Sequence, residues 1–270
     1  MRKILTALCA LLLAALLCAQ AETGVTRVLS IGITKYDDGR TRGGGVNSTQ
    51  GVFDAFSHGL TGECTMLLDL TNEEFYAAIA DTFAEATEDD VSILYINAHG
   101  GAEAGLSFVE TSDGLRVTAA HLESALRKID GRVVLLLDCC NSGGFTGSES
   151  EAQRLSGDAY ALDSFASGKY LVMVSCLSDE NSYRVAEGSS EEDKLSTVFS
   201  RALCEGLGWD LIKDRPTSLK ADADRDRAVT FAELCDYTRR RCLNYLHASG
   251  SVQTVSGSAA DASFVLTVKN

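Results

Sequence analysis

Short apolar runs rich in β-branched residues alternate along the chain with segments whose apolar residues recur every three or four positions. The first pattern predicts buried strands and the second predicts amphipathic helices. Strands are expected at 27–33, 64–68, 91–98, 132–138, 170–176 and 263–268. Helices are expected at about 46–59, 71–87, 118–128, 195–207 and 230–246. This alternation predicts an α/β fold, a three-layer sandwich with a mostly parallel sheet of about six strands and helices on both faces.

Two segments interrupt the alternation, residues 145–168 and residues 178–194. The first is rich in Ser, Glu and Gly, the second in Asp and Glu, and few apolar residues fall in either. Such segments are typical of exposed loops that can be cut without opening the core. Because no internal repeat and no second domain is visible, residues 22–270 are expected to form a single domain.

The N-terminus carries the one continuous apolar run of the sequence. Arg2 and Lys3 precede it, and the triplet Ala-Gln-Ala at 19–21 follows it. These are the parts of a secretory signal peptide, so residues 1–21 are expected to be removed after Ala21. No later stretch is long enough to cross a bilayer. The mature chain is therefore expected to be secreted or extracytoplasmic, with no membrane attachment.

Composition narrows the function classes. With 45% hydrophobic residues the chain can build a core, which excludes general disorder. Its 38 acidic and 24 basic side chains give a net charge of -14. A chain of this charge repels phosphate backbones, and no basic stripe offsets it, so nucleic-acid binding is excluded as the expected function.

Cysteine use does not fit a disulfide scaffold. The nine cysteines of the chain fall to seven when Cys9 and Cys18 leave with the signal peptide, and an odd number leaves one thiol without an intramolecular partner. Cys235 and Cys242 share a predicted helix but lie about 10 Å apart along its axis, beyond disulfide reach. An unpaired thiol in an exported protein indicates a chemical use for it.

Two predicted strands end in residues that can carry chemistry. His99 and Gly100 follow the strand at 91–98, and Cys140 follows the strand that ends at Asp138. The carboxyl ends of parallel strands form the ligand crevice of an open sheet, so the imidazole and the thiol can face each other there. A thiol needs such a base to become a thiolate at neutral pH. The backbone N–H groups of Gly100 and Cys140 are candidates for an oxyanion hole.

Each of these residues also has a simpler interpretation. A lone histidine is usually a satisfied polar group, and a strand-end cysteine is usually a small buried hydrophobe. Cys139 could form a strained disulfide with Cys140 that silences the nucleophile, although a Cys139 packed into the core is the simpler prediction. Thioredoxin-type redox chemistry requires two residues between its cysteines. The occurrence of both residue types at matching strand ends favours a catalytic pair.

The sequence resembles the caspase-like and metacaspase-like cysteine peptidases, in which a His-Gly motif and an Asp-x-Cys-x-Ser-Gly motif follow two successive core strands. His99-Gly100 and the run Asp-Cys-Cys-Asn-Ser-Gly at 138–143 match these motifs in register. The resemblance covers roughly residues 26–268 and implies a caspase-type sandwich, as in a secreted bacterial member of the family. It also implies peptide-bond hydrolysis without an organic cofactor, with His99 as the base and Cys140, not Cys139, as the nucleophile.

The same resemblance implies three substrate-binding positions. Asp138 would lie at the floor of the pocket for the residue before the scissile bond, where it would favour Arg or Lys. Ser48 stands where metacaspase-like members often carry an acid that helps to bind that basic side chain. Arg42 lies near the place where animal caspases have an arginine that binds aspartate. Cleavage after basic residues is the preferred expectation and cleavage after acidic residues the alternative. Asp138 could equally be a strand-end carboxylate that accepts backbone N–H bonds.

A second candidate site lies at residues 222–233, whose spacing matches the 12-residue calcium loop of an EF-hand. The expected ligands at positions 1, 3, 5, 7, 9 and 12 are Asp222, Asp224, Asp226, Ala228 through its carbonyl, Thr230 and Glu233. Arg227 stands at position 6 in place of glycine, at a cost of about 1 kcal/mol where φ is positive. Pro216 opposes an incoming helix, so half an EF-hand is expected. The alternative is a solvated loop that caps the next helix.

These observations predict an exported cysteine endopeptidase that acts on protein or peptide substrates and binds Ca²⁺, with the ion in a structural role first. The alternative is a non-catalytic, calcium-stabilised module that keeps the fold and binds peptides or proteins.

Overall fold

The computed structural model describes residues 24–60, 62–146, 165, 167–185, 195–258 and 263–268. The predicted signal peptide lies outside these residues. Among the helices that are described, none is long and apolar enough to cross a membrane.

A six-stranded sheet forms the centre of the domain, with the strand order β14-β8-β7-β3-β1-β2. Its strands are β1 (Thr26–Gly32), β2 (Glu63–Leu68), β3 (Val91–Asn97), β7 (Arg132–Asp138), β8 (Tyr170–Val174) and β14 (Ser256–Gly257). Neighbouring strands are parallel except β14, which is antiparallel to β8. Strands β1, β3, β7 and β8 are buried on both faces, which explains why their sequences are continuous apolar runs.

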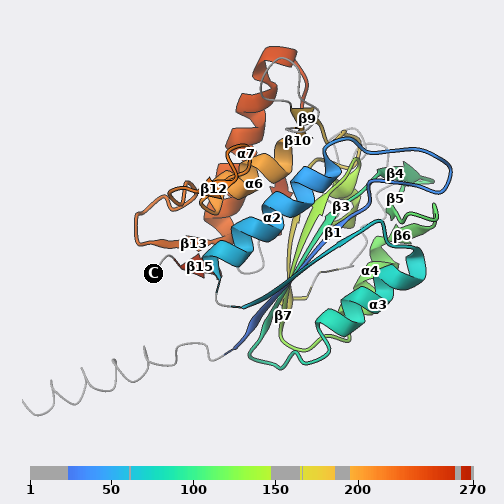
Figure 1. Cartoon of the computed structure of the whole chain (residues 1–270), viewed down its shortest axis with the longest axis horizontal. Coiled ribbons are helices and arrows are strands. Elements are labelled where there is room, and N and C mark those ends of the chain that lie inside the picture. The colour runs from blue at the N-terminus through green and yellow to red at the C-terminus, as the bar shows by residue number, and fades with distance from the viewer. Residues whose placement is uncertain are drawn as a thin grey trace, which may run out of the picture.

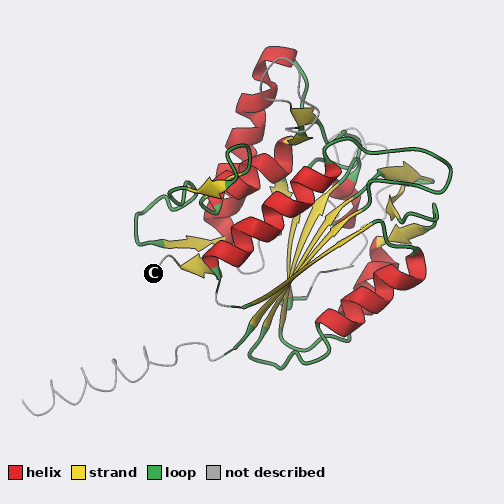
Figure 2. Ribbon diagram, in the orientation of Figure 1, coloured by secondary structure: helices red, strands yellow, loops and turns green. Residues whose placement is uncertain are grey.

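Helices cover both faces of this sheet (Figure 1, Figure 2). One face carries α2 (Gly45–Gly59), α6 (Val198–Gly206) and α7 (Phe231–Leu246), and the other carries α3 (Asn72–Thr82) and α4 (Ala119–Leu126). Each face has its own apolar cluster, the first including Phe56, Phe199 and Phe231 and the second including Phe75 and Leu122. The predicted three-layer α/β sandwich with a mostly parallel sheet is confirmed.

Short strands and turns complete the described chain. The antiparallel meander comprises β4 (Gly100–Glu103), β5 (Leu106–Glu110) and β6 (Arg116–Thr118). The two-stranded pairs are β9 (Arg184–Val185) with β10 (Ser196–Thr197), β11 (Trp209–Asp210) with β12 (Arg215–Pro216), and β13 (Ala228–Thr230) with β15 (Val265–Val268). Two 3-10 helices are η1 (Ser142–Phe145) and η3 (His247–Ser249). The meander begins directly after His99, so it fixes the chain that leaves β3.

Some expected element bounds are wrong. The segment 263–268 contributes β15, which pairs with β13, and the sixth place in the central sheet belongs to the two-residue strand β14. The helix expected at 71–87 ends at Thr82, and residues 83–85 form a turn. A two-residue strand gives no periodic signal, and a turn that continues an apolar helical pattern is invisible to periodicity.

The two predicted exposed loops lie largely outside the described residues, at 147–164 and 186–194. Among their described residues, Ser167, Gly168, Asp179, Asn181 and Arg184 are exposed, whereas three others are buried. Phe145 is 0% exposed and Phe165 6%, and both pack into the cluster beneath α3 and α4. Ser178 is also buried.

Candidate active site and calcium loop

The pairing of β3 with β7 brings His99 and Cys140 to one edge of the sheet. The two strands pair in parallel register up to Asn97 and Asp138, and each candidate lies two residues beyond that last pair. Both side chains are half-buried. Gly100 packs against the chain that leaves β7, because a Cβ on Gly100 would lie 2.4 Å from the Cys140 carbonyl oxygen. Only glycine allows the two strand ends to approach this closely.

Tyr36 holds the His99 end of the pair. The His99 backbone N–H donates to the Tyr36 hydroxyl at 2.7 Å, and the two rings lie 5.0 Å apart between centroids. Burial lowers the pKa of the His99 imidazole, and the cations of Arg42 and Arg40 lower it further. The imidazole is therefore neutral at neutral pH, which is the form that accepts a proton from a thiol.

The two adjacent cysteines have different environments. Cys139 is 0% exposed, and burial raises the pKa of its thiol well above the ordinary value. It packs into the core as predicted. The Cys140 sulfur accepts a hydrogen bond from the backbone N–H of Ser182 at 3.4 Å. The seven cysteines of the described residues are all free thiols, so Cys139 and Cys140 do not form a disulfide in this structure.

Asp138 is completely buried, and other side chains of the protein donate hydrogen bonds to its carboxylate. Its Oδ2 accepts from Tyr95 Oη at 2.8 Å, from Asn97 Nδ2 at 2.8 Å and from the Thr197 hydroxyl. Its Oδ1 accepts from Ser182 Oγ at 2.9 Å and lies 3.8 Å from Arg42 Nη2. This carboxylate is a hub between elements and does not form the open floor of a pocket.

The Arg42 side chain is also buried, and it hydrogen-bonds to groups of the protein. It is 6% exposed, and it donates to Asn97 Oδ1 at 3.1 Å and to the Ala98 carbonyl at 2.7 Å. It therefore braces the end of β3 immediately before His99.

Ser48 does not face a substrate. It is completely buried, donates to the Gly44 carbonyl at 2.8 Å and accepts from the Thr197 backbone N–H at 2.9 Å. The expectation that Ser48 touches a substrate side chain is wrong, because these two bonds use it to join α2 to β10.

A pocket of about 540 Å³ opens beside Arg42. Among its described lining residues, the charged ones are all basic: Lys35, Arg42 and Arg184. Arg42 also touches the carbonyls of Ala98 and Asp138, so one wall of this pocket adjoins the candidate dyad.

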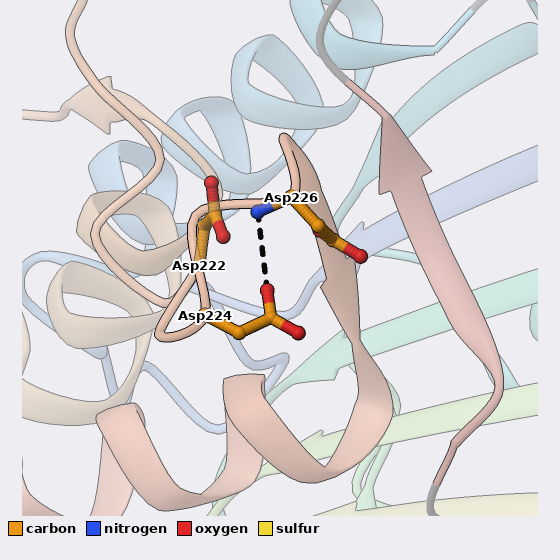
Figure 3. A group of neighbouring side chains, drawn as sticks. All are labelled: Asp222, Asp224 and Asp226. Atoms are coloured by element: carbon orange, nitrogen blue, oxygen red, sulfur yellow. Dashed lines mark hydrogen bonds between the residues drawn. The ribbon is translucent and has the colours of Figure 1, made fainter.

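The candidate calcium loop at residues 222–233 gathers three of its six expected ligands. The carboxylates of Asp222, Asp224 and Asp226 offer oxygens that all lie within 4.8 Å of one another (Figure 3). Asp222 Oδ1 is buried and has no hydrogen-bond partner. Arg227 adopts φ of 75°, so the backbone makes the turn for which an EF-hand loop normally uses glycine.

The remaining expected ligands have other partners. Glu233 lies outside the three-carboxylate cluster, and its Oε2 accepts from the Thr230 N–H at 2.9 Å and from the Thr230 hydroxyl at 2.8 Å. Thr230 and Glu233 thus form a capping box at the start of α7. Glu233 Oε1 accepts from the Ala223 N–H at 3.0 Å, which closes the loop onto its own beginning. Ala228 lies in β13, and β12 stands upstream where a complete EF-hand would have a helix.

Several residues of the site carry no motif in the sequence. Four residues bond directly to His99, Asp138 or Cys140: Tyr36, Tyr95, Thr197 and Ser182. Gln253 bonds to Tyr183, next to Ser182. The only sequence signal that could have indicated Ser182 and Gln253 is their position after a core strand and before the last strand of the central sheet.

Comparison with known proteins addresses the fold. The sequence matches no protein-family model and no curated protein. A crystal structure of a protein from Geobacter sulfurreducens is similar, with a TM-score of 0.60, 14% identity, and coverage of 91% of this chain and 100% of that one. Caspase-1 from Spodoptera frugiperda has a TM-score of 0.61 and 14% identity, covering 90% of this chain and 89% of its own. At this identity the likeness shows fold alone, and the chain has a caspase-like fold.

Proposed function

We propose that the chain is a cysteine endopeptidase in which His99 is the general base and Cys140 the nucleophile. The observation that supports this most directly is the register of β3 and β7, which delivers a neutral imidazole and a half-buried thiol to the same sheet edge. The caspase-like fold is consistent with the proposal.

The chemistry needs only these two side chains and backbone donors. The Cys140 thiol gives its proton to His99 as the sulfur bonds to the peptide carbonyl carbon. The carbon–nitrogen bond then breaks, and the imidazolium returns the proton to the leaving amine. Water hydrolyses the resulting thioester and releases the thiol. In this proposal the N–H groups of Gly100 and Cys140 bind the oxyanion.

We further propose that the basic pocket takes an acidic side chain of the substrate. Lys35 and Arg184 line it together with Arg42, whose charge already faces Asp138, so an anion there would offset the charges of Lys35 and Arg184. Cleavage after Arg or Lys would require the Asp138 carboxylate to bind the substrate, but five internal groups already surround it. The structure gives no support to the preferred expectation of a basic residue before the scissile bond.

The test uses the purified chain without residues 1–21, under reducing conditions. Fluorogenic peptides that end in Asp, Glu, Arg or Lys are compared, with Cys140→Ala and His99→Ala as matched variants. We expect hydrolysis of the acidic peptides and its loss in both variants. If no peptide is cut and an alkylating probe fails to label Cys140 faster than a free cysteine, the peptidase proposal is wrong. Cleavage of only the Arg and Lys peptides would overturn the pocket assignment alone.

We also propose that residues 222–233 bind one calcium ion. The buried, unpartnered Asp222 Oδ1 and the positive φ at Arg227 fit an oxygen-coordinated cation. Asp222, Asp224 and Asp226 would hold the ion with the Ala228 carbonyl. Thr230 and Glu233 would have to share oxygens that now cap α7. Because β13 pairs with β15, the ion would order the loop that leads into this small sheet.

Secretion is part of the same proposal. Residues 1–21 have the composition of a signal peptide, and weak calcium sites of about 10⁻⁴ to 10⁻³ M suit extracellular ion levels. N-terminal sequencing of the exported protein should begin at Glu22.

A further inference from the structure

Residues 253 and 254, near the C-terminus, bind the loop at 175–183 that follows β8. Gln253 is 0% exposed, and both ends of its side-chain amide are used. Its Nε2 donates to the Ser175 carbonyl at 3.0 Å, and its Oε1 accepts from the Tyr183 backbone N–H at 2.8 Å. This single side chain therefore ties the beginning of the loop to its end.

Glu180 and Thr254 add a second tie beside the first. The Glu180 carboxylate accepts from the Thr254 N–H at 2.6 Å, from the Thr254 hydroxyl at 2.9 Å and from the Leu177 N–H at 3.1 Å. The Glu180 carbonyl accepts from the backbone N–H of Asn141 at 2.9 Å. The loop is thus bonded to the residue directly after Cys140.

Ser182 is the part of this loop that reaches the candidate nucleophile. Its N–H donates to the Cys140 sulfur at 3.4 Å, and its hydroxyl donates to Asp138 Oδ1 at 2.9 Å. An N–H donor stabilises a thiolate more than a thiol, because hydrogen bonds to a charged acceptor are stronger than those to a neutral one. The position of this N–H depends on the adjacent Tyr183, which Gln253 holds.

We propose that Gln253 is a positioning residue for the reacting thiol. By fixing Tyr183 it places the Ser182 N–H against the Cys140 sulfur and so favours the thiolate. The inference rests on the proposed function, in which Cys140 is the nucleophile. Gln253 itself lies behind the loop and touches neither Cys140 nor a substrate.

Several titratable and charged groups lie on the elements around Cys140, and all of them stay unchanged in the variants used. The titratable and charged groups around it are His99 after β3, Asp138 and Cys139 on the β7 side, Cys176 and Glu180 after β8, and Arg42 before α2.

The experiment measures the thiol directly and needs no peptide substrate. The rate of alkylation of Cys140 by iodoacetamide is followed against pH by mass spectrometry of the peptide that contains it. Gln253→Met keeps the volume of the side chain but removes its donor and its acceptor. Ser182→Pro removes the N–H itself. We expect each change to slow the alkylation of Cys140 near neutral pH by roughly tenfold, because the thiolate loses the N–H donor that stabilises it.

Three variants separate positioning from general loss of structure. Ser182→Ala keeps the N–H and loses only the bond to Asp138 Oδ1, so it should shift the alkylation profile less than Ser182→Pro. Thr267→Val removes a buried bond to the Gly59 carbonyl far from the site and should lower the thermal midpoint without shifting the profile. Thr254→Val removes the hydroxyl that donates to Glu180. It should shift the alkylation profile in the same direction as Gln253→Met, but by a smaller amount. This variant still tests the proposal if Gln253→Met does not fold.

The outcomes are distinct from those of the peptidase test. A folded Gln253→Met variant with an unshifted profile, beside a shifted Ser182→Pro, would overturn the role of Gln253. Unshifted profiles in both would overturn the role of the Ser182 N–H. A shifted profile in a protein that cuts no peptide would leave the positioning inference in place and remove the peptidase.

Discussion

Asp138 and Asp222 lie in two regions that differ in how their carboxylates are satisfied. Asp138, at the end of β7, has five side-chain partners, and they come from residues 41 to 96 positions away. Asp222, in the loop before α7, accepts from the Arg227 N–H at 3.2 Å through Oδ2, while its buried Oδ1 has no partner.

This difference assigns the two carboxylates different roles. A buried acid with complete hydrogen bonding stabilises the fold, and removing it leaves its partners unsatisfied. A buried oxygen without a donor is a place where a cation can bind. The carboxylate at the strand edge is therefore complete in its hydrogen bonds, whereas the loop before α7 keeps one buried oxygen that a cation could use.

The largest expected effect is at Asp138. Asp138→Asn should lower the free energy of unfolding by about 3 kcal/mol or more, because Arg42 is left as a buried cation without its counter-charge. Urea unfolding measures the loss. Asp222→Asn, compared in the presence of chelator, should cost less than about 1 kcal/mol. Equal losses in the two variants would contradict the comparison.

Calcium should have the next largest effect. At a concentration tenfold above its dissociation constant, the ion should stabilise the chain by about 1.4 kcal/mol and raise the thermal midpoint by about 4 °C. Scanning calorimetry with calcium and with chelator measures this shift. Asp224→Asn should abolish it, whereas Asp138→Asn should keep it in whatever folded protein remains. A midpoint that is indifferent to calcium at 10 mM, on the order of ten times a 10⁻³ M constant, would remove the calcium proposal.

Arg227→Gly tests the backbone of the loop. Because Arg227 has φ of 75°, glycine should relieve strain and raise the free energy of unfolding by up to about 1 kcal/mol in chelator. Lys220→Gly, at an exposed position without a positive φ, should instead lower it. Thermal unfolding in chelator compares the two, and destabilisation by both would show that the loop does not require a left-handed residue.

The smallest expected effect is on the pH profile. In the proposed mechanism activity requires neutral His99, so it should be lost as pH falls through the imidazole pKa, which burial and two cations lower. Arg40→Gln removes one cation and should move the acidic limb of kcat/KM upward by roughly a few tenths of a pH unit. Glu110→Gln should move it downward, since that carboxylate raises the pKa of His99. Shifts of the same sign would contradict this account.

The number of positions that separate the hydrogen-bonded residues explains which parts of the site could be predicted from the sequence. The hydrogen bonds within the candidate calcium loop join residues two to ten positions apart, so the spacing of its acids indicated the cluster. The strand ends carrying His99 and Cys140 could be predicted because buried parallel strands leave continuous apolar runs.

The hub around Asp138 could not be predicted in this way. Thr197 and Ser182 reach it from 59 and 44 positions away, and a single threonine or serine has no distinguishing pattern in a sequence. For the same reason Gln253 was missed, and Ser48 was placed on the substrate side although it binds Thr197 in the interior.

The contact between Gly100 and the chain that leaves β7 limits how far apart the ends of β3 and β7 can lie. A side chain at position 100 would push the two strand ends apart, because its first carbon would overlap the Cys140 carbonyl oxygen and the Cys139 side chain. The separation of the proposed base and nucleophile therefore depends on two main chains that are in contact. Repacking of the surrounding side chains cannot compensate for a bulkier residue there.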